Sequence, residues 1–75
     1  MNLNTFLNIL KEENLNNFSF DTTILKAYTV YFIKEPDCFS VFTTDEKAAV
    51  FGKISSFSNE SEAYENALKR LRAFK

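Results

Sequence analysis

Three segments rich in aromatic and β-branched residues follow one another with almost no chain between them. Residues 27–34 (AYTVYFIK), 38–44 (CFSVFTT) and 48–57 (AAVFGKISSF) have the composition of β-strands. The connectors 35–37 (EPD) and 45–47 (DEK) are too short for a parallel crossover, which needs about a dozen residues or more, but they suffice for antiparallel hairpins. The spacing therefore predicts a three-stranded antiparallel meander.

Alternation along these strands predicts which side chains face the core. In the third segment we expect Val50 and Ile54 to point inward, because Lys53 between them requires water. Gly52 interrupts the same segment and indicates a bulge. The second face of the sheet is expected to carry Phe42 and Phe51, and to be open or covered by a partner.

One helix is predicted before the meander in the sequence, and a second one after it. In residues 2–15 the apolar positions recur at helical spacing and form one stripe, with Asn2 or Asn4 as N-cap and the end of the helix at residues 16–17. This stripe consists of Leu3, Phe6, Leu7 and Leu10.

The second helix is predicted to begin after Asn59, an N-cap with Glu62 three residues later, as in a variant capping box. Acidic residues precede basic ones along it, which suits the helix dipole. Its buried stripe is predicted to consist of Ala63, Ala67, Leu68, Leu71 and Phe74. Two helices on one face of a three-stranded sheet make an α+β, αβββα two-layer sandwich, and 75 residues make a single domain, 1–75.

Composition removes several classes of activity. The chain has no histidine and one glycine, so the usual catalytic triads, most zinc sites and glycine-rich phosphate loops are not expected. The lone Cys38 has no histidine to activate it and is interpreted as structural. We therefore predict a protein that is not an enzyme and that holds no metal or other cofactor.

The net charge and the first ten residues predict a soluble protein. A net charge of −1 gives no basic face for nucleic acid or for an anionic membrane. The first ten residues, MNLNTFLNIL, have neither the basic start of a signal peptide nor the length of a membrane span. With a single cysteine and no basis for an internal disulfide, a cytoplasmic location is expected.

The segment from Tyr28 to Phe74 resembles the small immunity proteins of bacterial polymorphic-toxin and contact-dependent inhibition systems. Those proteins run from aromatic strands and short turns into a helix opened by a pattern like F-x-x-E-x-E-A-aromatic. The matching residues here are Phe57, Glu60, Glu62, Ala63 and Tyr64. This chain has no Trp, and where the family often has a Glu-Arg-Gly turn it reads DEKA at residues 45–48.

The resemblance implies an immunity protein that binds and neutralises a cognate bacterial toxin, which could be a basic toxin or nuclease. Two alternatives stay open, namely a phage- or plasmid-borne inhibitor of a host defence nuclease and a small self-associating structural module. A monomer or weak homodimer is expected. Acidic turn residues and exposed aromatic residues are the predicted partner-binding set, because rim charges speed encounter and aromatics carry affinity. The set consists of Glu35, Asp37, Phe42, Asp45, Glu46 and Phe51.

Overall fold

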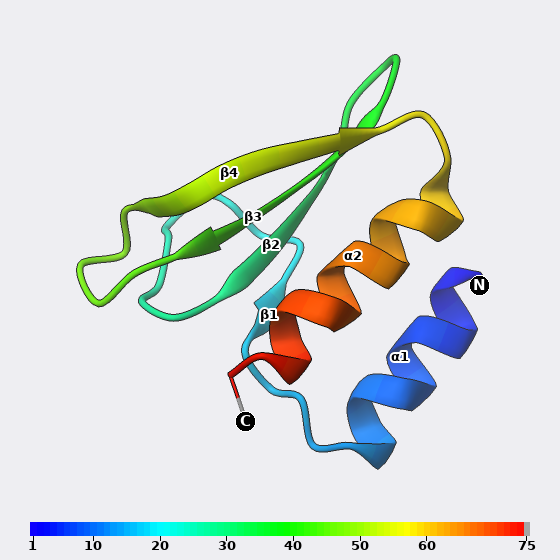
Figure 1. The fold of residues 1–75 in the computed structure, drawn as a ribbon, viewed down its shortest axis with the longest axis horizontal. Coiled ribbons are helices and arrows are strands. Elements are labelled where there is room, and N and C mark those ends of the chain that lie inside the picture. Colours follow the sequence, from blue (N-terminus) through cyan, green and yellow to red (C-terminus); the bar gives the residue numbers. More distant parts are fainter. Residues whose placement is uncertain (75) are drawn as a thin grey trace.

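A computed structural model describes residues 1–74 and has two helices and a four-stranded sheet. The elements in chain order are α1 (Leu3–Glu12), β1 (Phe18–Ser19), β2 (Val30–Lys34), β3 (Phe39–Thr44), β4 (Val50–Phe57) and α2 (Glu60–Arg72). Both helices lie on one face of the sheet (Figure 1), as predicted. The class is α+β.

The sheet has the order β1-β2-β3-β4. Its last three strands form the predicted antiparallel meander. The prediction of three strands was wrong, because β1 adds a fourth that runs parallel to β2 through the pairs Phe18 with Val30 and Ser19 with Tyr31. A strand of two residues is too short to show the alternation of side chains from which strands are predicted.

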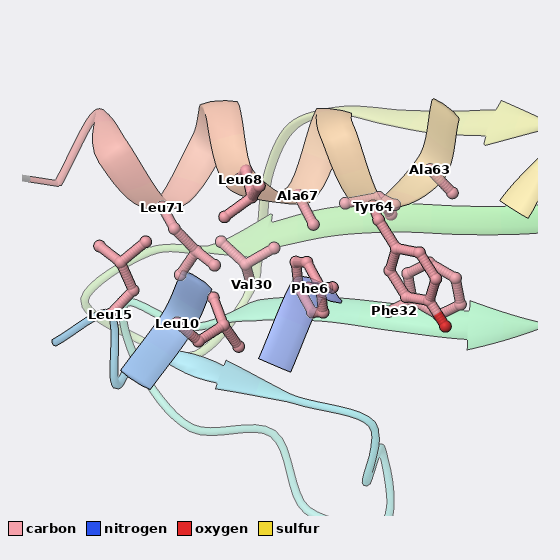
Figure 2. Close-up of a cluster of buried hydrophobic side chains, with 11 residues drawn as sticks. Phe6, Leu10, Leu15, Val30, Phe32, Ala63, Tyr64, Ala67, Leu68 and Leu71 are labelled. Carbon is pink, nitrogen blue, oxygen red and sulfur yellow. The ribbon is translucent and has the colours of Figure 1, made fainter. Parts of the chain in front are cut away.

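The main core lies between the sheet and the helices (Figure 2). Val30 and Phe32 of β2 face α2, and in Figure 2 the ring of Phe6 of α1 lies between these two side chains. The ring of Tyr64 stacks on Phe6 with centroids 4.7 Å apart and on Phe32 at 4.8 Å. The first helix, the sheet and the last helix therefore share one aromatic cluster.

Both predicted N-caps are confirmed. The side chain of Asn2 accepts from the Thr5 amide at 2.9 Å, and that of Asn59 accepts from the Glu62 amide at 3.2 Å. The first helix ends earlier than expected. Asn14 takes the left-handed conformation (φ 54°), and the Leu15 amide donates to the Leu10 carbonyl at 2.8 Å, which closes a Schellman-type end.

Part of each predicted apolar stripe is not buried. Phe6 and Leu10 of α1 are buried, but Leu3 and Leu7 are 40% and 42% exposed. In Figure 1, α1 lies beside α2 and near the β1 edge, so it has a narrower surface to cover. In α2 the first four residues of the predicted stripe are buried, while the fifth, Phe74, is 40% exposed. The four buried residues are Ala63, Ala67, Leu68 and Leu71.

The second face of the sheet is not open around its centre. Tyr31 and Phe42 point away from the helices and are almost completely buried. The connection between β1 and β2 closes over them, since the Lys26 amide donates to Tyr31 Oη at 2.7 Å and Thr44 Oγ1 donates to the Lys26 carbonyl at 2.6 Å. The expectation that Phe42 would lie on an open face was therefore wrong.

Candidate functional site

The β3–β4 hairpin extends beyond the end of α2 (Figure 1). Helix α2 follows β4 through a short connection and runs back along the sheet. Its 13 residues span about 20 Å, whereas the 8 residues of β4 span about 26 Å. The helix is therefore too short to cover the helix-facing side of the hairpin.

A groove of about 450 Å³ lies at this uncovered end of the sheet. Three of the aromatic side chains that line it come from different parts of the chain: Tyr28 before β2, Phe51 in β4 and Phe74 after α2. They are 51%, 66% and 40% exposed. We call this site the hairpin groove, and define it by Tyr28, Thr43, Glu46, Phe51, Arg70 and Phe74.

A bulge in β4 positions Phe51. The register places Phe51 opposite Thr43 and Ser55 opposite Val41, so three residues of β4 stand opposite the single Phe42. Gly52 lies in this bulge with φ 71°, as its position in the sequence predicted. Thr43 faces α2, so Phe51 faces the helix side as well, and the prediction that it shares a face with Phe42 was wrong.

The predicted inward face of β4 is not the one that the structure has. Val50 and Ile54 were predicted to point inward, but they are 45% and 51% exposed. Val50 lies opposite Thr44, on the face away from the helices, and every residue from Val50 to Ile54 is exposed. The alternation itself is kept across the bulge, since Phe51 and Ser55 both face the helices, so the prediction was wrong because it assigned the alternate positions of β4 to the wrong faces.

Arg70 forms the base of the hairpin groove. Its Nη1 donates to Thr43 Oγ1 at 2.9 Å, and its Nη2 donates to the Lys53 carbonyl at 2.9 Å and to Ser55 Oγ at 3.0 Å. Its Nε donates to Asn66 Oδ1 at 2.8 Å. Burial lowers the pKa of this guanidinium. The side chain thus joins α2 to β3 and to the bulge of β4 in a fixed position.

The acidic turn forms the outer rim of the groove. Asp45 is half-buried, and its Oδ1 accepts from the backbone amides of Lys47 at 2.8 Å and Ala49 at 3.0 Å. Glu46 is exposed and accepts from the Tyr28 hydroxyl at 3.5 Å. Asp45 therefore holds the turn together, while Glu46 presents its carboxylate to solvent.

The structure brings together half of the predicted partner-binding set. Asp45, Glu46 and Phe51 line the hairpin groove. Glu35 and Asp37 lie in the β2–β3 turn, at the opposite end of the sheet (Figure 1). There the Cys38 thiol donates to Glu35 Oε2 at 3.0 Å, and this hydrogen bond raises the pKa of the thiol. Phe42 is buried and lies outside the groove.

Sequence reasoning missed Tyr28, Arg70 and Phe74 as members of the site. Arg70 was read as a dipole charge, and Phe74 continued the buried stripe of α2. The lengths of the elements carried the missing signal, because a long last strand followed by a shorter returning helix leaves the hairpin end uncovered. Tyr28 adopts φ 51°, which is uncommon for an aromatic residue and which no sequence pattern indicates.

Comparison with known proteins found no matching family model, no matching curated protein and no matching solved structure. No helix within residues 1–74 has the length and apolar character needed to cross a membrane. The same residues contain no group of three or more Cys, Asp or Glu side chains that could hold a metal ion.

Proposed function

We propose that this chain is a cytoplasmic immunity protein that binds a cognate bacterial toxin and neutralises it without catalysis or a cofactor. The observation that carries the proposal is the exposure of three aromatic side chains around one groove, Tyr28, Phe51 and Phe74. Clustered aromatic residues next to a rigid base are the usual source of affinity in protein interfaces. The resemblance of residues 28–74 to immunity proteins supports the same function.

The acidic turn supports a partner with a basic surface. Glu46 stands at the rim with its carboxylate exposed, and rim charges steer encounter and select partners more than they hold them. The ring of Phe51, which also lines the groove, is suited to slow dissociation. This division of roles predicts that changes at the two residues affect different rate constants.

The experiment begins with the neighbouring genes. A large secreted protein encoded beside this chain would be purified as its isolated toxic domain, titrated with this protein and co-expressed with it in bacteria. We expect a one-to-one complex and restored growth. Phe51→Ala should accelerate dissociation, whereas Leu7→Ala, a truncation at a partly exposed position of α1 outside the groove, should not. Absence of both binding and protection would exclude the proposed function.

Self-association is a second candidate, because β4 is an edge strand with exposed apolar side chains. Val50, Phe51 and Ile54 all lie on this edge and are about half exposed or more. Exposed strand edges of this kind pair readily with another chain. Sedimentation over a wide range of protein concentrations tests it, and a monomer at every concentration would exclude it.

A further inference from the structure

Arg70 places a fixed positive charge in the hairpin groove. Four of the five N–H groups of a guanidinium are engaged here, and all four donate to neutral oxygen acceptors. Among residues 1–74, no carboxylate forms an ion pair with Arg70. A half-buried cation that no carboxylate within residues 1–74 pairs with favours an anion that a ligand or partner brings.

The surroundings of Arg70 determine what kind of anion fits. Phe51 and Phe74 line the same groove and are 66% and 40% exposed, so both side chains are available to a third apolar group. The volume of about 450 Å³ falls in the usual range for a bound small molecule or inserted side chain. Lys53 also lines the groove, with its backbone carbonyl bound to Arg70 Nη2, while Glu46 at the rim repels a carboxylate.

We propose that the hairpin groove takes a segment of the partner protein in which a large apolar side chain stands next to a carboxylate. The apolar group packs between Phe51 and Phe74, and the carboxylate accepts from the remaining N–H on Nη1 of Arg70. The separation of Glu46 from Arg70 fixes the orientation, with the carboxylate toward α2. This inference rests on the proposed function and specifies what the partner presents.

The test uses two probes that differ in one charge, N-acetyl-L-phenylalanine and N-acetyl-L-phenylalaninamide. Each is titrated into the isotope-labelled protein, and backbone amide and Arg70 Nε–H shifts are followed by NMR. We expect saturable shifts around Thr43, Phe51 and Arg70, with the acid bound roughly tenfold more tightly than the amide because it gains a charge-assisted hydrogen bond.

Two variants separate the charge from the apolar contact. Phe51→Ala should weaken both probes alike and leave the fold intact, because the ring is exposed. Arg70→Gln should remove the preference for the acid. If Arg70→Gln unfolds the protein, the effect of Phe51→Ala and the ratio of the affinities for the two probes still test the inference. Equal affinity for acid and amide, or shifts confined to other surfaces, would overturn the inference.

Other occupants give different results. Groove shifts that depend on protein concentration alone would show that a second copy fills the site. A stoichiometric small acid retained in native mass spectrometry of fresh protein would show a metabolite site. Either result overturns a partner segment as occupant. None of these measurements requires the toxin, so failure here is distinguishable from failure of the toxin titration.

Discussion

Phe42 stacks on Tyr31 on the sheet face opposite the helices, with ring centroids 5.3 Å apart and an interplanar angle of 21°. Both rings are covered by the connection between β1 and β2. This pair forms a second, smaller apolar layer that a three-stranded sheet with one open face would lack.

Truncation of Phe42 should therefore be a folding defect. Phe42→Ala is expected to lower the free energy of unfolding by roughly 3–5 kcal/mol, because it removes a buried ring and leaves a cavity. Urea denaturation measures this, with Phe51→Ala as the exposed control at below about 1 kcal/mol. Weakened toxin affinity of the folded fraction of Phe42→Ala would contradict the assignment.

Ala48→Gly should stabilise the protein. Ala48 closes the β3–β4 turn with φ 61°, a left-handed conformation that costs an L-residue roughly 1–2 kcal/mol. Glycine adopts it freely but loses more chain entropy on folding, so a net gain of about 0.5–1 kcal/mol is expected. Thermal melts would show a raised Tm. Ala49→Gly, at a neighbouring position without positive φ, should lower it instead.

Asp45 and Glu46 should respond differently to substitution, although both belong to the predicted partner-binding set as acidic turn residues. Asp45→Ala removes the acceptor for two backbone amides and should cost about 1 kcal/mol, as loss of a helix cap does. Glu46→Lys should leave the unfolding free energy almost unchanged but slow association with a basic toxin. Denaturation and stopped-flow binding at several salt concentrations would separate the two effects.

Tyr64 should make the fold sensitive to alkali. Burial and the hydrogen bond to Glu60 Oε2 at 2.9 Å raise the pKa of Tyr64 from 10.0 to about 12. The folded state therefore retains a proton that the unfolded chain loses. Stability is complete below pH 10 and falls between pH 10 and 12, by up to roughly 2–3 kcal/mol.

Urea titrations between about pH 8 and pH 11 measure this loss. Tyr64→Phe keeps the stacking on Phe6 and Phe32 but has no hydroxyl to ionise. The unfolding free energy of Tyr64→Phe should decline less over the same pH range. Its value at about pH 8 can be lower than that of the unmodified protein, because the variant lacks the hydrogen bond to Glu60. A parallel decline in both proteins would show that another group causes the alkaline loss.

Local sequence signals were enough to predict the helices, the meander and the caps. Asn2 and Asn59 cap as expected, because an N-cap depends on a side chain and an amide three residues apart. Gly52 marked the bulge for the same local reason. β1 was missed because its two residues are defined by the strand they pair with, which lies twelve residues along the chain.

The candidate site was half predicted, since only part of it depends on local features. Asp45 and Glu46 are recognisable as an acidic turn, and Phe51 as an aromatic residue near it. Arg70 belongs to the groove because α2 ends before it reaches the hairpin end of β4. This arrangement depends on the packing of two elements and not on a local sequence pattern. The bulge decides that Phe51 lies opposite Thr43, and no composition specifies the size of a bulge.

The stacking of Phe6 on Tyr64 has a consequence for the order of events during synthesis. The two rings are 58 residues apart, so the first helix has no aromatic partner from α2 until nearly the whole chain has been made. Contacts of such long range form late and slow folding. The nascent chain therefore carries Phe6 and Leu10 uncovered while the meander is being translated. A frameshift or stop codon before α2 would release a product that keeps its strands and lacks the cover for them, a fragment suited to chaperone capture and degradation.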